Sequence, residues 1–294
     1  MSTCIRKLKA AHDDERLAQL HCILLMMMDD FMQVCKAEDI TWVGMYGTAI
    51  GALRHQGFIP WDDDIDICMT RSELERFCKV AQDTMSDKYA IINSQTCATY
   101  PMSTTRLVLK GTEFRDENLA TMDFDSGIFL DLFALDAISD DEKAFKKQSW
   151  NTWFYNKLAM ARDIAHPYIA PGGIREPILR LGTTICRGIL HLPYLRSYDF
   201  NAKSLRWAKA YEGVSTERVA YLCDTTRFSC IYNRDDLFPV RWVDFEDIQI
   251  PVARRAEKLL EEYYGDWQTP PDESMRHEHY PDILDFGDYK PRCL

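Results

Sequence analysis

Residues 46–69 read YGTAIGALRHQGFIPWDDDIDICM, and we expect the rest of the chain to be organised around this stretch. It carries four carboxylates within five residues, followed by alternating apolar side chains. Successive side chains of a strand point to opposite faces, so Asp64 and Asp66 would share one face while the isoleucines beside them enter a core. Two carboxylates held this close repel each other, and a divalent cation is the usual means of keeping both ionised.

The segment before the acids predicts a phosphate-binding turn. Gly47 and Thr48 follow an apolar, strand-like run and precede a short helix-like segment that ends in Arg54 and His55. A strand, a turn of small residues and a helix start leave backbone N–H groups free to face an anion, and the helix dipole favours the same charge.

The acidic run has other interpretations. A solvated turn would not need Ile59, Pro60 and Trp61 before it, nor the apolar alternation after it. The Asp-Asp-x-x-Asp motif of prenyl-transferring enzymes also fits, but that fold is all-helical and carries a second acidic motif. In this chain no other Asp-Asp pair is followed by an Asp at the same spacing.

A calcium-binding EF-hand loop is a further alternative. Its oxygen ligands at positions one, three, five and twelve would be Asp62, Asp64, Asp66 and Glu73. Position six must be glycine for a sharp turn, and Ile67 stands there. A β-branched residue strongly resists the positive φ that this turn needs, which argues against the loop.

Residues 47–67, GTAIGALRHQGFIPWDDDIDI, closely resemble the signature of the LicD family, which includes bacterial phosphocholine transferases and is similar to the fukutin-related phospho-alditol transferases. The resemblance implies a nucleotidyltransferase-type fold in which a Gly-Ser-like turn and an Asp-x-Asp pair bind a nucleotide and divalent metals. By it, Gly47 and Thr48 form the turn, and Asp64 and Asp66 form the pair. Residues 264–271, YGDWQTPP, are also similar to LicD sequences, in which this block returns to the core.

The remaining periodicity predicts a helix over 13–37 whose methionines pack in a core, and a second helix opened by a capping box at 70–73. Strands are expected at 42–46, 89–94, 105–110, 127–133 and 245–251. With the resemblance, this indicates an α+β fold with an α/β-type core, a nucleotidyltransferase-like mixed sheet flanked by helices. We expect a catalytic core over 1–139, a helical insertion over 140–215, and a part over 216–294 that returns to the core.

One acid of the apolar strand 129–133 needs a partner. Burying an unpaired carboxylate is costly, so Asp131 should lie beside a cation. An ion pair with Arg106 or Lys110, which share a face of one expected strand, would meet this need. Helped by the resemblance, the other interpretation is that Asp131 is the third metal ligand, with Asp136 as the fallback.

Composition and charge indicate which partners and which cellular compartment to expect. The 294 residues carry a formal net charge of −11, which argues against nucleic-acid binding because phosphate backbones need a basic face. Ten scattered cysteines without a Cys-x-x-Cys pair, no membrane-span-length run and no apolar leader predict a cytoplasmic protein with reduced thiols. The arginine-bearing apolar segment 175–196 could lie peripherally on the inner face of an anionic membrane, or could be an ordinary amphipathic helix.

Together these observations lead to the hypothesis of a metal-dependent phosphotransferase. It would move phosphocholine or a phospho-polyol from a CDP-activated donor to a sugar hydroxyl of a glycan or lipid-linked glycan, and release CMP. Mg²⁺ or Mn²⁺ would be held by Asp64, Asp66 and Asp131. The donor would be bound by Gly47, Thr48, Arg54, His55 and Lys110. The alternatives are a nucleotidyltransferase that transfers NMP from an NTP, and a non-catalytic nucleotide- or sugar-binding module.

Overall fold

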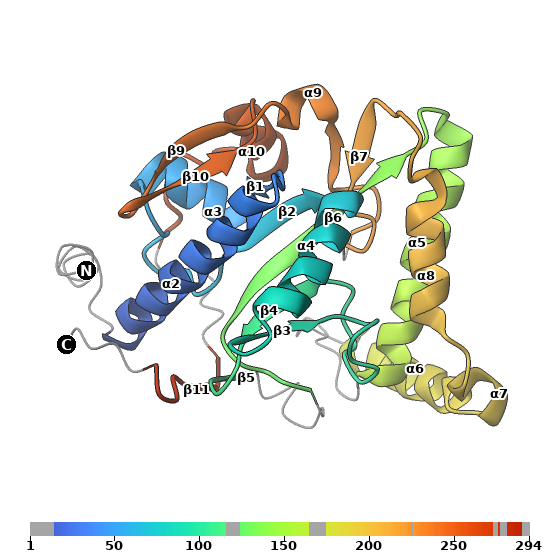
Figure 1. Ribbon diagram of the computed structural model, residues 1–294. Helices are drawn as coiled ribbons and strands as arrows, with labels where there is room; N and C mark the ends of the chain where they lie inside the picture. The colour runs from blue at the N-terminus through green and yellow to red at the C-terminus, as the bar shows by residue number, and fades with distance from the viewer. Residues whose placement is uncertain are drawn as a thin grey trace.

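The computed structural model describes residues 15–115, 124–164, 175–224, 226–272, 276 and 281–289. Within these residues one mixed sheet of nine strands forms the centre of the molecule. Its main path runs β3-β4-β6-β2-β1-β10-β9, and β7 and β8 continue it from the far end of β6. Helices cover the sheet (Figure 1), so the predicted α+β class with a mixed sheet flanked by helices is confirmed.

The two central strands run parallel. They are β2 (Asp66–Thr70) and β6 (Phe129–Ile138), and they pair with Asp66 opposite Asp131. On one side of this pair lies β4 (Thr105–Leu109), which is antiparallel to β6, and beyond it β3 (Tyr89–Ile92), which is antiparallel to β4. On the other lie β1 (Val43–Gly44), β10 (Ile248–Val252) and β9 (Arg241–Phe245).

Helices α2 (Glu15–Ala37) and α4 (Arg71–Thr84) lie across one face of the sheet, in front of it in Figure 1. The apolar stripe of α2 faces inward, because Leu20, Met27 and Phe31 are fully buried. The methionines therefore pack in the core, as their spacing predicts. Helix α4 begins at the expected place, but the prediction of a capping box is wrong. The Thr70 hydroxyl bonds to the Ser72 hydroxyl instead of accepting from a backbone N–H.

Short helices follow the first strand. Helix α3 (Tyr46–Ile50) continues directly into η1 (Gly51–His55), a single π-helical turn. Late in the chain, α9 (Arg234–Leu237) precedes β9, and α10 (Ala256–Tyr264) packs against α3. Strand β5 (Glu113–Arg115) pairs with β11 (Ile283–Asp285) in a separate two-stranded sheet.

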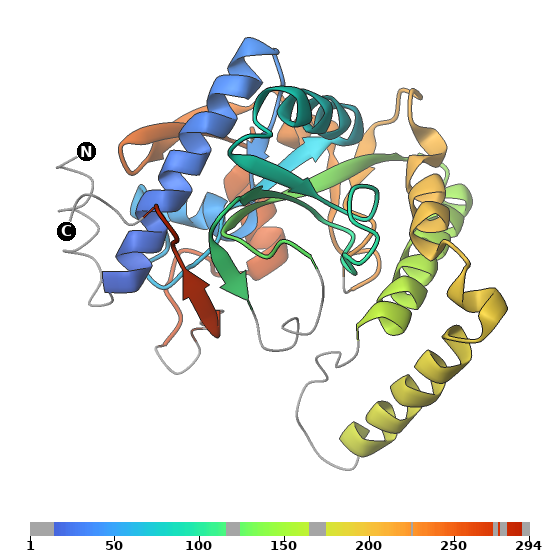
Figure 2. The same cartoon turned by 60° about the horizontal axis from the view of Figure 1, so that its bottom comes forward.

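Between β6 and β7 (Arg218–Ala220) the chain is helical. Helix α5 (Glu142–Asp163) packs along α8 (Phe200–Ala208), while α6 (Arg175–Leu190) and α7 (Pro193–Arg196) extend away from the body in Figure 2. The turn η3 (Lys209–Tyr211) leads back to β7, which pairs with β8 (Ile231–Asn233). The domain boundaries expected from the sequence stay a prediction.

The close packing of η1 against the turn after it generates a first prediction. A Cβ added to Gly51 would lie 2.4 Å from the carbonyl oxygen of Gly57, a backbone atom with no freedom to move alone. Gly51→Ala should therefore lower the free energy of unfolding by about 1–3 kcal/mol, measured in urea. Gly188→Ala is the control, because Gly188 lies in α6 with nothing within 4 Å and alanine there should raise stability by about 0.5–1 kcal/mol. Equal stability of Gly51→Ala and the wild type would contradict this account.

Candidate active site

The acids gather where the two central strands begin. Asp66 is the first residue of β2, and the parallel register places Asp131 of β6 beside it. Neighbouring residues in register on adjacent strands share a face, so both carboxylates point the same way. Oxygens of Asp64, Asp66 and Asp131 all lie within 4.8 Å of one another, and those of Asp62, Asp63 and Asp64 form a second such group.

This concentration of negative charge shifts the acids' protonation. Burial, and then the charges of Asp64 and Asp131, raise the pKa of Asp66 well above its ordinary value. Burial and the charge of Asp64 act in the same direction on the pKa of Asp62. Burial alone raises the pKa of Asp63 to about 6, and its Oδ2 is a buried oxygen without a hydrogen-bond partner among the described residues. The cluster therefore favours any cation that enters it.

One cation is already present in the protein. The Arg106 Nε donates to Asp131 Oδ1 at 3.0 Å, and the guanidinium lies 3.6 Å from the centre of the Phe129 ring. The ion pair that the sequence offered for Asp131 is thus present, while the same carboxylate also belongs to the acidic group, whose binding of a metal stays a prediction. Asp136, the fallback, is held by Arg71 through bonds of 2.8 and 3.0 Å.

The glycine-threonine turn is tied directly to the acids. The Thr48 Oγ1 accepts a bond of 2.8 Å from the backbone N–H of Asp66. A Cβ on Gly47 would lie 2.7 Å from Asp62 Oδ2, so only glycine lets this carboxylate approach the turn. Tyr46, just before it, has a φ of 50°, a conformation that a bulky residue adopts only when its surroundings impose it.

Two expected donor-binding residues lie at the end of η1. The Arg54 Nε donates to His55 Nε2 at 2.9 Å, and its Nη1 donates to the carbonyl of Trp267 at 2.5 Å. Arg54 therefore joins η1 to the C-terminal block 264–271, which the LicD resemblance also singled out. The histidines at 277 and 279 lie outside the described residues.

Lys110 takes a different position from the other expected site residues. It follows β4 and is exposed, and its Nζ donates to the carbonyl of Ser86 at 2.5 Å. Arg106 lies four residues earlier, so Lys110 is about 13 Å further along the strand from the acids. The described geometry brings together Gly47, Thr48, Asp64, Asp66 and Asp131, and it does not bring Lys110 to them.

Sequence reasoning missed part of the cluster. Asp62 and Asp63 were visible in the acidic run, but strand alternation singled out only Asp64 and Asp66. Strand β2 begins at Asp66, so Asp62 and Asp63 lie in the loop before it. His21 was not singled out either. Its Nε2 lies 2.6 Å from the Asp62 carbonyl oxygen, and its ring stacks on Phe58 at 3.9 Å, so it positions the acidic loop from α2.

Comparison with known proteins relates this part of the chain, with its mixed sheet, short turn and paired acids, to nucleotidyltransferase domains. The family model described as LicD/FKTN/FKRP, nucleotidyltransferase domain, matches residues 39–170. The chain is also 26% identical over 270 residues to the lipopolysaccharide cholinephosphotransferase LicD of Haemophilus influenzae, covering 90% of this chain and 96% of that protein. The chain is thus similar to LicD proteins, both within residues 39–170 and over most of its length. Among the described residues, no helix has both the length and the apolar character needed to cross a membrane.

The Arg106–Asp131 pair generates the second prediction. Arg106→Met should lower the free energy of unfolding of the metal-free protein by about 3–5 kcal/mol, because Asp131 would then lie among acids without its counterion. Asp131→Asn should cost less, since it removes one of the repelling charges and leaves Arg106 near Asp64. Urea melts in the presence of a chelator measure both.

The pair between Arg71 and Asp136 supplies the comparison. This pair is similarly buried but is not part of the acidic groups found in the described residues. Arg71→Met and Asp136→Asn should therefore lower the free energy of unfolding by amounts similar to each other. If Asp131→Asn proved as destabilising as Arg106→Met, repulsion among the acids would not dominate this site.

Proposed function

We propose that this LicD-like transferase moves phosphocholine or a related phosphorylated alcohol from a CDP-activated donor to a sugar hydroxyl of a glycan or lipid-linked glycan, releasing CMP. The observation that carries the proposal is the group formed by Asp64, Asp66 and Asp131 beside the turn at Gly47 and Thr48. The similarity to a lipopolysaccharide cholinephosphotransferase supports phosphocholine transfer in general, and the lipopolysaccharide on which that relative acts supports a glycan acceptor.

The acids fit a magnesium or manganese ion. They offer hard carboxylate oxygens within 4.8 Å of one another, and burial together with the neighbouring carboxylates raises the pKa of Asp66, so a cation among them would be favoured. Asp64, Asp66 and Asp131 would hold the ion. When bound, such a metal neutralises the diphosphate of the donor and polarises the bond to be broken.

The residues of the turn would orient the diphosphate. The Thr48 Oγ1 already accepts from the Asp66 N–H, so the hydroxyl proton of Thr48 remains available for a phosphate oxygen. Backbone N–H groups around Gly47 would add donors for the phosphates, as expected for a turn that opens a helix. The guanidinium of Arg54 lies close by in sequence and would bind the leaving CMP from the η1 side.

The transfer itself needs positioning more than covalent chemistry. The sugar hydroxyl oxygen forms a bond to the phosphorus of the phosphocholine group, and the bond from that phosphorus to the oxygen of CMP breaks. The hydroxyl proton passes to solvent or to an acidic oxygen of the site, and CMP leaves with the bonding electron pair. A nucleotidyltransferase would use the same acids but would release pyrophosphate from an NTP.

Product analysis provides the third prediction. With CDP-choline, Mg²⁺ and a glycan acceptor, the wild type should release CMP and no pyrophosphate. Asp64→Asn and Asp66→Asn should each lower turnover by about 10³-fold, as expected for loss of a preorganised electrostatic group. Asp83→Asn, which changes an exposed acid on α4, is the matched control and should keep wild-type turnover. A binding module without activity would show no CMP release with any variant.

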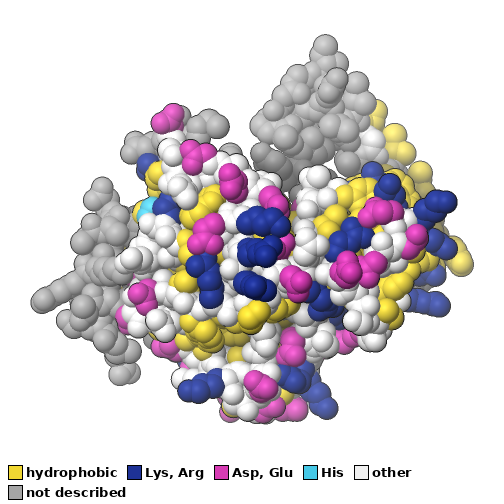
Figure 3. Space-filling model, turned by 90° about the horizontal axis from the view of Figure 1, so that it is seen from above, with side chains coloured by type: hydrophobic (Ala, Val, Ile, Leu, Met, Phe, Trp, Pro, Cys, Tyr) yellow, Lys and Arg dark blue, Asp and Glu magenta, His cyan; other side chains and the backbone are white. Residues whose placement is uncertain are grey.

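We also propose that α6 and α7 contact the inner face of an anionic membrane, where a lipid-linked acceptor would lie. Leu181, Ile185 and Ile189 recur every four residues on α6, and each is more than half exposed. Tyr194 of α7 is 79% exposed, and Arg187 and Arg196 lie along the same arm. On the right of Figure 3, over this helical part, hydrophobic side chains lie beside those of Lys and Arg. The side chains of 175–180 lie outside the described residues.

Vesicle binding tests the contact and is the fourth prediction. The wild type should sediment with vesicles rich in phosphatidylglycerol and less with neutral ones, because the arm combines apolar and basic residues. Ile185→Glu should abolish sedimentation. Val214→Glu, which adds the same charge at an exposed apolar residue outside the arm, should leave it unchanged. Equal sedimentation of the two variants would remove the arm from this role.

A further inference from the structure

Aromatic rings lie next to the acids on the same face of the sheet. Phe133 is two residues after Asp131 on β6, so the two side chains point to one face. The Tyr46 ring meets the Phe133 ring with centroids 5.6 Å apart at 74°, and the Tyr221 ring meets it at 5.1 Å and 83°. The rings of Tyr46 and Tyr221 therefore both contact the Phe133 ring, each nearly at right angles to it. The ring of Tyr263, at the end of α10, lies beside that of Tyr46, with the ring centroids 5.7 Å apart.

We call Tyr46, Phe133, Tyr221 and Tyr263 the aromatic cluster. Its rings remain partly open to solvent, unlike core aromatics such as Phe31 and Phe77, which are fully buried. Tyr263 is 46% exposed, and the other three are half-buried. Tyr46 and Tyr263 also line a small pocket together with residues of α10, so part of each of these two rings faces open space.

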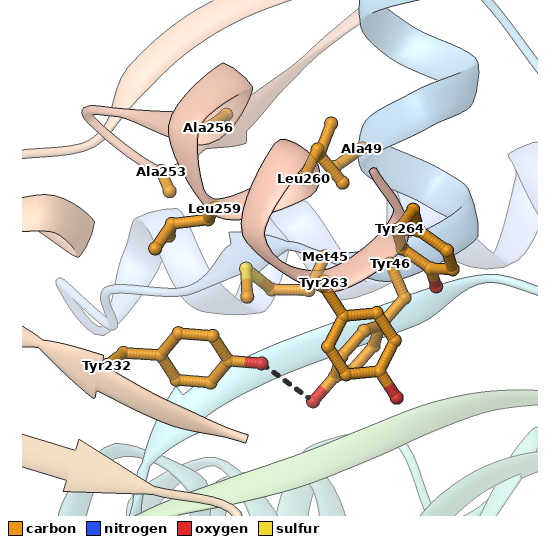
Figure 4. Close-up of a pocket in the computed structure, with 10 residues that line it drawn as sticks. All are labelled: Met45, Tyr46, Ala49, Tyr232, Ala253, Ala256, Leu259, Leu260, Tyr263 and Tyr264. Carbon is orange, nitrogen blue, oxygen red and sulfur yellow. Dashed lines mark hydrogen bonds between the residues drawn. The ribbon is translucent and has the colours of Figure 1, made fainter. Parts of the chain in front are cut away.

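The cluster is held in place. The Tyr232 hydroxyl donates to the Tyr46 hydroxyl at 3.2 Å, and Figure 4 shows Tyr46 and Tyr263 side by side below the end of α10. The strained φ of 50° at Tyr46 directs its ring from the residue just before the Gly47-Thr48 turn. Because strain of this kind persists only where surrounding contacts impose it, the ring position is a constrained feature of the fold.

The charges around the cluster favour a cation. Burial, with the nearby Cys230 and Asp224, raises the pKa of Tyr263 to about 12, and Asp66 adds to the shift. Burial also raises the pKa of Tyr221, to which Asp131 and Asp224 contribute. The phenols therefore remain neutral while carboxylates lie near them. Neutral ring faces with their negative quadrupoles, set among acids, attract positive charge.

We infer that the aromatic cluster is a subsite for a quaternary ammonium group, the trimethylammonium end of the choline donor. Such an ion has no N–H to donate, so it is recognised by ring faces within about 6 Å. The distance fits, because two residues along β6 separate the phosphate-facing Asp131 from Phe133, about 7 Å, and a two-carbon link separates the phosphate of phosphocholine from its nitrogen.

The same surface would suit other alcohols poorly. A phospho-polyol needs hydrogen-bond partners for its hydroxyls, and a primary ammonium needs acceptors for its three N–H groups, whereas ring faces satisfy neither. The inference rests on the proposed function, since it locates one end of a donor whose phosphates lie at Asp64 and Asp66. It goes further by choosing choline among the alcohols that the acids alone would accept.

Calorimetric binding of three nucleotides tests the subsite. With Mg²⁺ present, the wild type should bind CDP-choline about tenfold more tightly than CDP-ethanolamine, a ratio expected from cation–π contact with a partly desolvated ion. CDP should bind to wild type and variants alike. Tyr263→Ala should remove most of the preference for choline, whereas Tyr263→Phe, which keeps the ring, should retain it.

Controls separate the possible results. Trp242→Ala removes an exposed aromatic residue outside the cluster and should leave the preference unchanged. Equal binding of CDP-choline and CDP-ethanolamine by the wild type, with CDP still bound, would overturn the subsite but keep the nucleotide site. Failure of all three nucleotides to bind would overturn the proposed function and the subsite with it. The wild-type comparison needs no variant, so it decides even if Tyr263→Ala does not fold.

Discussion

The parallel pairing of β2 with β6 holds two carboxylates side by side against their mutual repulsion, and the other parts of the site depend on it. Asp66 and Asp131 are adjacent because of backbone register, so the two residues stay side by side whatever rotamers their side chains adopt. The surrounding sheet supplies the stabilisation, with buried residues such as Ile67 and Leu132 between the acids and α4. Arg106 and the Thr48 hydroxyl then fix individual groups around the pair.

Local patterns in the sequence were sufficient for the fold class and for the expectation that Asp64 and Asp66 lie close together. Alternation along 64–67 identified the Asp64 and Asp66 pair, and helical spacing identified the buried face of α2. The α+β class followed from strands and helices in this order. These inferences succeeded because each depends on neighbours within a few residues, where side-chain direction follows directly from strand or helix geometry.

What the sequence could not supply depends on distant pairing. Nothing local shows that Arg106 lies opposite Asp131, so the sequence could not show that one carboxylate forms an ion pair and also belongs to the acidic group. Lys110 shares the face of Arg106 but lies beyond the region of the acids, because register decides where a face meets its neighbours. The aromatic rings come from four segments between residues 46 and 263, and no spacing rule joins them.

The Arg106 guanidinium gives the site a permanent positive charge, with which the metal ion of the proposed function would have to compete. Because it already compensates Asp131, a bare divalent ion gains less there than it would from three uncompensated acids. A diphosphate brings negative charge of its own and restores the balance in favour of the ion. Under the proposed function, the arrangement would couple retention of the ion to the presence of donor, and the empty enzyme would exchange its ion more readily than the loaded one.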